Sequence, residues 1–186
     1  MESVTKEFNY SLLKSCGKDV IISANVEIKR PQLVSVGNHV AIDSGFYCTV
    51  KAEIGDYIHI APYVTAIGGE PGVLRMGHFT TIAAGSRLIC VSDDYSGEGL
   101  IGPLMPEGIR GKRTIAPIVL ENFAGIATNS VVLPGVKLAE GSILGACSML
   151  THDTEPWTIY MGVPARPILP RKKDCKEKAK QLGYDL

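Results

Sequence analysis

The strongest constraint on the fold is a six-residue repeat of apolar side chains. An α-helix repeats every 3.6 residues and a strand every two, so a period of six matches neither. It is typical of a coil of short strands joined at tight corners, in which each repeated side chain points into a narrow interior. The repeat occupies three blocks: Val36, Ile42, Cys48, Ile54, Ile60 and Ala66; Met76, Ile82 and Leu88; and Leu120, Ile126, Val132, Leu138, Leu144 and Leu150.

Small side chains accompany this repeat. Ala52, Ser86 and Ser130 each stand four residues after a repeated position, where a small side chain can share the interior near a corner. Glycine and asparagine support the positive φ that tight corners require. Phe46 and Ile58 are large for the same position, so we expect their coils to pack differently or to be wider. The alternative fold is a β-sandwich with coincidental spacing.

Interruptions of the repeat define the organisation of the chain. Gly68 to Gly72 are expected to form a short extruded turn, and the polar, Gly- and Pro-containing segment that follows Ser92 is too long for a corner. Long loops in compact domains tend to be functional. We therefore expect one domain over 1–186, with regular coils at about 20–92 and 114–155, an extruded loop at 93–113 and a C-terminal extension at 156–186.

The two ends of the repeat are less regular. Lys6 to Ser15 could form one or two helical turns, and a two-residue slip is expected just before Val36. Three prolines prevent the segment 162–170 from continuing as helix. After it, residues 171–183 are expected to form a short helix that Gly183 ends.

Charge and cysteine content exclude several classes of function. The 19 basic and 19 acidic residues give no net charge, which offers no long-range attraction to nucleic acid or to an anionic membrane. No apolar run reaches membrane-span length, and the first residues lack a signal-peptide pattern. Five scattered cysteines without a CxxC pair argue against a disulfide framework and a zinc finger. We therefore expect a cytoplasmic protein.

Two segments resemble known enzymes. The run VLPGVKLAEGSILGACSMLTHD, followed by GVPARPI, resembles the C-terminal coils of hexapeptide-repeat acetyltransferases such as the galactoside, maltose and xenobiotic enzymes. The resemblance implies an all-β, left-handed parallel β-helix that works as a homotrimer, with acetyl-CoA between neighbouring subunits and no metal. The run SDDYSGEGLIGPLMP is similar to enzymes that N-acetylate nucleotide-linked amino sugars, of the type acting on dTDP-4-amino-4,6-dideoxyglucose in surface polysaccharide and lipopolysaccharide biosynthesis.

The same resemblance bears on the catalytic base. In the galactoside and maltose enzymes a histidine just after a repeat strand takes the acceptor's proton, and that position falls on Asp93 here. Asp93 and Asp94 could instead bind the incoming ammonium group and steer its proton. The alternatives are that both aspartates only cap a turn, or that His59, on the outward face beside Ile60, is the base.

For the cofactor, the resemblance assigns residues near the C-terminal coils. His152 replaces a common lysine and either touches the CoA pyrophosphate or ends the coil. A second arginine of the family aligns with Leu169, so Arg171 or Lys172 would supply the contact to the 3′-phosphate. Arginine suits phosphate because its donors form a fixed fork. The residues expected at acetyl-CoA are Thr128, Ala146 and Thr151 along the pantetheine arm, and His152, Arg166 and Arg171 toward the nucleotide.

Three rival functions remain at the level of sequence. An O-acetyltransferase of a sugar hydroxyl would normally need the histidine base that the loop lacks. A zinc carbonic anhydrase needs three converging histidines, but His39, His59 and His78 occupy different phases of the repeat. A non-enzymatic trimer scaffold would need neither the long loop nor Arg166. Cys48 and Cys90 are expected in the interior, without the neighbours of a catalytic thiol.

Overall fold

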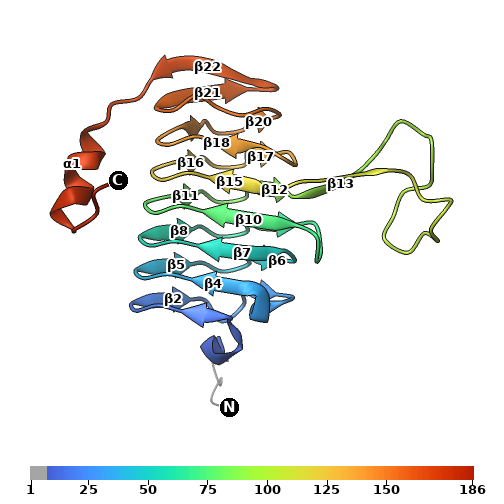
Figure 1. Ribbon diagram of the computed structural model, residues 1–186, viewed down its shortest axis with the longest axis horizontal. Helices are drawn as coiled ribbons and strands as arrows, with labels where there is room; N and C mark the ends of the chain where they lie inside the picture. The colour runs from blue at the N-terminus through green and yellow to red at the C-terminus, as the bar shows by residue number, and fades with distance from the viewer. Residues whose placement is uncertain (1–7) are drawn as a thin grey trace, which may run out of the picture.

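The computed structural model describes residues 8–186, in which the chain winds through three parallel sheets in turn (Figure 1). Sheet A contains β1 (Ser15–Cys16), β4 (Val34–Val36), β7 (Lys51–Ile54), β10 (Val73–Met76), β15 (Ile118–Leu120) and β18 (Lys137–Leu138). Sheet B contains β2 (Val20–Ile22), β5 (Val40–Ile42), β8 (Ile58–Ile60), β11 (Thr81–Ile82), β16 (Gly125–Ile126), β19 (Ile143–Leu144), β21 (Thr158–Gly162) and β22 (Ala165–Pro170). Sheet C contains β3 (Glu27–Ile28), β6 (Tyr47–Cys48), β9 (Thr65–Ile67), β12 (Arg87–Ile89), β17 (Val131–Val132) and β20 (Met149–Leu150).

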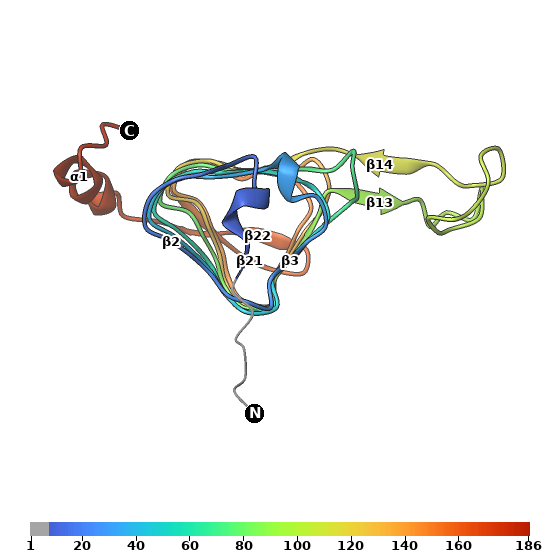
Figure 2. The same cartoon turned by 90° about the horizontal axis from the view of Figure 1, so that it is seen from below.

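Seen along the coil axis, the three sheets enclose a triangular interior (Figure 2). Three six-residue repeats complete one coil, so Ile42 pairs with Ile60 and Ile126 with Leu144 in sheet B. The expected all-β, left-handed parallel β-helix is therefore confirmed, as are the extruded loop and the short C-terminal helix. We name the three edges of this prism the A/B, B/C and C/A corners after the sheets that meet there.

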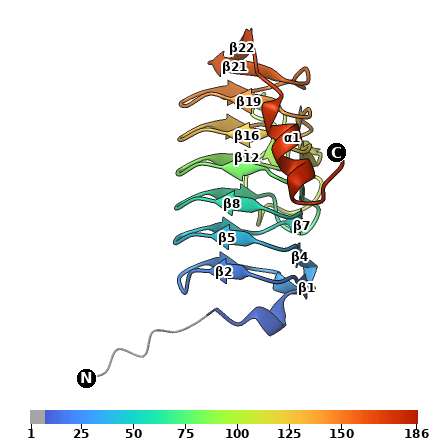
Figure 3. The same ribbon diagram turned by 90° about the vertical axis from the view of Figure 1, so that its left-hand side faces the viewer.

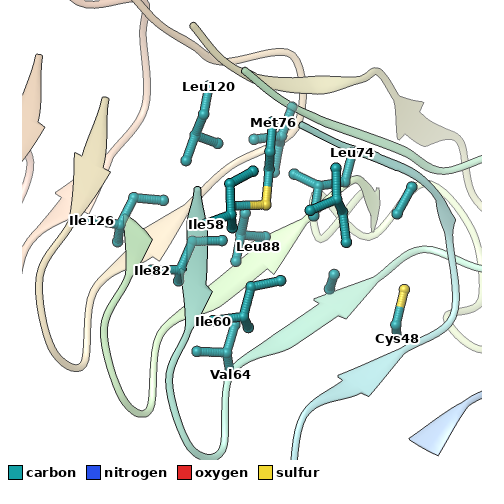
Figure 4. Close-up of a cluster of buried hydrophobic side chains, with 14 of the residues drawn as sticks. Cys48, Ile58, Ile60, Val64, Leu74, Met76, Ile82, Leu88, Leu120 and Ile126 are labelled. Carbon is teal, nitrogen blue, oxygen red and sulfur yellow. The ribbon is translucent and has the colours of Figure 1, made fainter. Parts of the chain in front are cut away.

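The interior is built from the six-residue repeat (Figure 4). Every residue of the three repeat blocks is at most 5% exposed. Full burial of a Val, Leu or Ile side chain contributes roughly 1.5–3 kcal/mol, so the repeat supplies the main stabilisation of the coil. Phe46 and Ile58 are buried as well, so the interior accommodates both large side chains. Buried Ser86 and Ser130 donate hydrogen bonds to the carbonyls of Ala127 and Gly145, which satisfies their hydroxyl groups.

Aromatic side chains occupy the A/B corner, where the sequence favoured glycine or asparagine. Tyr57, Phe79, Phe123 and Trp157 all have a positive φ, which is uncommon for bulky residues. Their rings lie one above another in successive coils, with Tyr57 and Phe79 5.1 Å apart and Phe79 and Phe123 5.2 Å apart between ring centroids. Stacking of this kind contributes about 0.5–1.5 kcal/mol per pair and offsets the backbone strain.

The C-terminal segment covers this corner. After the antiparallel hairpin β21–β22 closes the upper end of sheet B, the chain leads into α1 (Asp174–Gln181), which lies beside the coils at the A/B corner (Figures 1 and 3). Ala179 of α1 is buried with Phe123 and Trp157. Gly183, with φ of 87°, follows the helix and ends it as expected.

Both interruptions of the repeat leave the prism at the C/A corner. Gly68 to Gly72 form the expected turn between β9 and β10. The long insertion is an antiparallel hairpin of β13 (Val91–Asp93) and β14 (Arg113–Ile115) that projects far from the coils (Figure 2).

The structure gives the limits of the coils strand by strand. Coils already begin at β1, stop after Ile89 and resume at Ile118, and β21 of the extension still pairs in parallel with β19. The approximate limits 20–92, 93–113, 114–155 and 156–186 expected from the sequence differ from these strand bounds by a few residues. Short apolar strands at the base of a hairpin carry the same pattern as coil strands, which is why the sequence did not separate them.

Smaller expectations at the N-terminal end are met where the structure describes the chain. The 3₁₀ turns η1 (Tyr10–Leu12) and η2 (Pro31–Leu33) lie there, and η2 takes up the two-residue slip because Ile22 still pairs with Ile42. Lys6 falls outside the described residues. Within residues 8–186, no helix has the length and apolar character needed to cross a membrane.

Candidate active site

Asp93 lies at the base of the projecting hairpin. It ends β13 and faces Arg113 of β14 in the strand register. Its Oδ1 accepts a hydrogen bond of 2.9 Å from Nη2 of Arg110, and both side chains are only 19% exposed. Asp93 is therefore the acidic member of a largely buried ion pair with Arg110.

Asp94 has different partners. Its backbone N–H donates to the carbonyl of Lys112 at 2.9 Å, and its Oδ1 accepts a hydrogen bond of 2.8 Å from the backbone N–H of Ser96. That bond holds the pKa of Asp94 below its usual range, so the carboxylate is charged at neutral pH. Among the described residues no cationic group lies within ion-pairing distance of Asp94. Asp94 thus caps a turn, as the simpler interpretation expected, and also presents an unpaired negative charge.

His59 is far from this pair of aspartates within one chain. It projects outward from β8, and its Nε2 lies 2.8 Å from Oδ2 of Asp43. Sheet B, which carries His59, forms the side of the prism opposite the C/A corner from which the hairpin emerges (Figure 2). A single chain therefore does not bring His59 together with Asp93 and Asp94.

Several of the residues assigned to acetyl-CoA share one edge of the prism. Thr128 and Ala146 occupy equivalent, exposed positions in successive coils at the B/C corner. The backbone N–H of Cys147 donates to the carbonyl of Thr128 at 2.9 Å, which keeps the two coils in step. This edge offers a continuous run of backbone groups and small side chains, which suits an extended amide-containing chain.

The remaining residues lie in the last coil and on the hairpin above it, and Thr151 and His152 follow a strand of sheet C, so they lie toward the C/A corner. Thr151 and His152 are exposed directly after β20, with Oγ1 of Thr151 3.2 Å from Nδ1 of His152. Arg166 is exposed on β22 opposite Met161, and Met161 covers Gly145 so closely that a Cβ there would lie 2.6 Å from it. Arg166 therefore belongs to the layer above Ala146, near the same corner.

Arg171 is placed differently. Its Nη1 donates to the carbonyls of Phe123, at 2.7 Å, and Gly141, at 2.9 Å, at the A/B corner. Its guanidinium group also lies 5.8 Å from the ring centroid of Trp157. The structure thus separates Arg171 from the other five residues assigned to acetyl-CoA and ties it to the aromatic corner.

Each of the other two histidines has its own aspartate. His39 lies 3.3 Å from Asp19 and stacks on Tyr57, whereas His78 lies 3.2 Å from Asp56. Within residues 8–186 there is no group of three or more His, Cys, Asp or Glu side chains that could hold a metal ion. Cys48 and Cys90 lie in the interior, as expected from the sequence. Burial raises the pKa of both thiols to about 11.

Comparison with known proteins identifies the family. No protein-family model matches the sequence. A dTDP-4-amino-4,6-dideoxy-D-glucose acyltransferase from Escherichia coli is 32% identical over 169 residues, which cover 88% of this chain and 85% of that protein. The chain belongs to the hexapeptide-repeat acyltransferases, the family of that enzyme. Like them it is an acyltransferase.

Solved structures of hexapeptide-repeat acyltransferases resemble the whole chain. A variant of AntD, an N-acyltransferase from Bacillus cereus in complex with dTDP-4-amino-4,6-dideoxyglucose and coenzyme A, is 31% identical with a TM-score of 0.90, over 98% of this chain and 100% of that one. AntD with dTDP and 3-hydroxybutyryl-CoA is 32% identical with a TM-score of 0.89, over 96% and 97%. A hexapeptide-repeat acetyltransferase from Vibrio cholerae, 19% identical with a TM-score of 0.58 over 88% and 77%, shares the fold alone.

Two features of this hexapeptide-repeat acyltransferase were missed at the level of sequence. Arg110 was not singled out, although a basic residue near the end of an acidic loop is a signal for an ion pair. The partnership of Asp56 with Tyr184, whose hydroxyl donates to Oδ2 at 2.7 Å, joins residues far apart in the chain and carries no local pattern.

Proposed function

We propose that this chain is an acetyl-CoA-dependent N-acetyltransferase that acts on the amino group of a nucleotide-linked, dTDP-linked amino deoxysugar. The proposal includes a cytoplasmic role in making sugars for surface polysaccharides such as lipopolysaccharide. The observation that supports this proposal most strongly is the carboxylate of Asp94, which is charged, is held by Ser96 and forms no ion pair among the described residues, although Lys112 lies near enough to help lower its pKa. A carboxylate of this kind attracts an amine, whereas a hydroxyl acceptor carries no charge for it to bind.

Residues at the B/C corner support the proposal that acetyl-CoA is the acyl donor. Acetyl-CoA supplies the thioester, and the exposed backbone at Thr128 and Ala146 can pair with the amides of its pantetheine arm. Arg166 offers charge-assisted donors to the phosphate groups. The E. coli and B. cereus relatives named above act on or bind dTDP-linked amino sugar, and the AntD structures contain coenzyme A or an acyl-CoA.

In the transfer, the amine nitrogen forms a bond to the acetyl carbon while the carbon–sulfur bond breaks. Starting from the ammonium form, the nitrogen must lose one proton before it attacks and a second as the amide forms; the departing thiolate gains one proton and the other passes to solvent. We assign Asp94 to hold the ammonium form and to take or steer this proton, with Asp93 supporting it. The lowered pKa of Asp94 favours orientation of the ammonium group over strong proton abstraction, so alignment supplies much of the rate.

The proposal also includes a homotrimer. The projecting hairpin exposes apolar side chains that a lone chain leaves in water: Tyr95 is 75% exposed, Leu104 is 89% exposed, and Leu100 and Ile109 exceed half. Exposed apolar patches commonly mark interaction surfaces. A neighbouring copy would cover the hairpin and would complete a site whose candidate groups lie on opposite sides of one prism.

The test is turnover with two matched acceptors. Purified protein is mixed with acetyl-CoA and either dTDP-4-amino-4,6-dideoxyglucose or dTDP-glucose, which has hydroxyls but no amine. Release of the CoA thiol and the mass of the sugar product are followed. We expect acetylation of the amino sugar as an amide and none of dTDP-glucose. Ester formation on dTDP-glucose would instead support an O-acetyltransferase, and no turnover with either sugar would contradict the proposal.

A further inference from the structure

The B/C corner continues below the residues assigned to acetyl-CoA. Hydrogen bonds link its successive coils, since the N–H of Asn129 donates to the carbonyl of Ala84 at 2.9 Å and the N–H of Gly85 donates to the carbonyl of Pro62 at 3.0 Å. Neighbouring coils are about 4.8 Å apart, the spacing of paired strands. We name the equivalent corner residues of four successive coils the donor edge: Pro62, Ala84, Thr128 and Ala146.

Ala84 lies at the height at which acyl transfer is expected. The nucleotide end of the donor is assigned to the layer of Arg166, above Ala146, so the pantetheine arm runs downward and its thioester approaches Ala84. The coil of Ala84 also carries the base of the hairpin, because β12 of that coil leads into β13. In a homotrimer whose axis follows the coils, a neighbouring copy would present its own Asp94 at this height.

The polar character of the donor edge ends one coil lower. The backbone N–H groups of Ala84, Thr128 and Ala146 donate to no acceptor among the described residues, so they are available to the carbonyl oxygens of the donor. Proline has no backbone N–H, so this series of donors stops at Pro62. The hydrocarbon part of an acyl group needs no such donor. The edge therefore changes from polar to apolar where the acyl chain would begin.

The surface below Ala84 is made of two rings. Pro62 is half-buried, and Tyr63 is 66% exposed. The Tyr63 ring lies across Gly45 of the next coil so closely that a Cβ on Gly45 would be 2.6 Å from Cδ1 of the ring. Arg87 holds the backbone of this turn, because its Nη1 donates to the carbonyl of Tyr63 at 2.7 Å. The two rings thus form a fixed apolar surface that continues the donor edge.

We propose that Pro62 and Tyr63 bind the acyl chain of the donor, so that this protein transfers acyl groups longer than acetyl, such as butyryl. The inference rests on the proposed function and names the class of acyl group that the donor carries. An acetyl methyl group ends beside Ala84, whereas a butyryl chain extends down to the two rings. Burial of each added methylene group strengthens binding about fourfold.

The chemistry is the same as for acetyl transfer. The amine nitrogen forms a bond to the acyl carbon and the carbon–sulfur bond breaks. The thiolate gains one of the two protons that the ammonium group loses, and the other passes to solvent. Only the length of the transferred chain differs, so the two donors can be compared directly.

The test uses acetyl-CoA and butyryl-CoA with dTDP-4-amino-4,6-dideoxyglucose, followed by release of the CoA thiol. The wild type should have a kcat/KM for butyryl-CoA at least equal to that for acetyl-CoA. Tyr63→Ala removes the ring and should lower the butyryl-to-acetyl ratio of kcat/KM about tenfold, as expected for two methylene groups left in water. Tyr63→Phe keeps the ring and should retain the wild-type ratio. The Kd of unacylated CoA should be the same in all three proteins.

The matched control is Tyr47→Ala, because Tyr47 is a half-buried tyrosine of the next coil that lies on β6 of sheet C, beyond the corner. It should keep the wild-type ratio, and circular dichroism verifies that each variant is folded. If the wild type acetylates the amino sugar but does not use butyryl-CoA, or if Tyr63→Ala has the same ratio as Tyr47→Ala, the acyl assignment is wrong and the proposed function stands. A wild type that transfers neither acyl group to the amino sugar overturns both.

Discussion

The hydroxyl of Tyr184 donates a 2.7 Å hydrogen bond to Oδ2 of Asp56, a carboxylate 128 residues earlier in the chain. Asn38 and His78 also contact this carboxylate. Burial alone would raise the pKa of Asp56, but the hydrogen bonds from Asn38 and Tyr184 and the nearby His78 outweigh it, so its pKa lies below the usual range. The bond to Asp56 raises the pKa of Tyr184 to about 12. One carboxylate thus fastens the C-terminal segment to the A/B corner.

This contact predicts a pH-dependent stability. Because the pKa of Asp56 is lower in the folded state than in the unfolded chain, its stabilisation is complete above about pH 4 and is lost as pH falls through the folded value. Asp56→Asn should lower stability at pH 7 by about 1–3 kcal/mol. The difference in Tm between wild type and variant should shrink below about pH 4. A difference that stays constant from pH 7 to pH 3 would exclude this role.

Arg171 is predicted to stabilise the fold. Its guanidinium group binds two carbonyls at the A/B corner and lies against Trp157. Arg171→Ala should therefore lower Tm while leaving the Kd for CoA unchanged. The exposed neighbour Lys172 provides the control, since Lys172→Ala should alter neither quantity. Weaker CoA binding with an unaltered Tm would instead return Arg171 to the 3′-phosphate, as the sequence resemblance implied.

Arg166 is predicted to bind the cofactor. It is exposed near the B/C corner, and its only side-chain bond within the described chain is to the adjacent carbonyl of Ala165. Arg166→Ala should weaken CoA by roughly 1.5–3 kcal/mol if it makes a charge-assisted phosphate bond. The affinity for dTDP should not change. Unaltered CoA affinity in this variant would show that the residue has been assigned wrongly.

The chain is predicted to be a trimer at micromolar concentration. Light scattering measures its mass directly. Replacing exposed apolar residues of the hairpin, as in Leu104→Ser, should weaken the assembly without unfolding the coils, because Leu104 is 89% exposed in one chain. The circular dichroism spectrum serves as the control. A monodisperse monomer that is nevertheless fully active would refute the trimeric site.

The coil could be predicted because the direction of each side chain depends only on its place in the six-residue repeat. Each repeated position, such as Ile82 or Leu144, points into the interior, so all the positions of the three repeat blocks are buried as the period of six predicted. The buried serines followed from the same period. The hairpin base was harder, since Val91 and Ile115 resemble coil residues until the strand partner is known.

The aromatic corner could not be predicted in the same way. Phe79 and Phe123 adopt a positive φ only because rings in neighbouring coils and the C-terminal segment pack on them. A preference for glycine or asparagine at such corners is a local rule, and tertiary packing overrides it here. Prediction of the candidate site was limited because it also depends on tertiary contacts. Asp93 and Asp94 could be identified from the sequence, but the ion pair between Asp93 and Arg110 depends on how the hairpin folds back.

The role of Asp94 is tested most directly by the steady-state kinetics of Asp94→Asn with acetyl-CoA and dTDP-4-amino-4,6-dideoxyglucose. The variant keeps the shape of the side chain and removes its charge. Loss of a general base typically costs 10²–10⁴-fold in rate, and loss of a charge that only orients the ammonium group costs less. We predict a strong fall in kcat/KM with unchanged CoA affinity, a fall for Asp93→Asn as well, and a milder effect for His59→Asn. Near-wild-type activity in both aspartate variants with an inactive His59→Asn would contradict the account and move the base to His59.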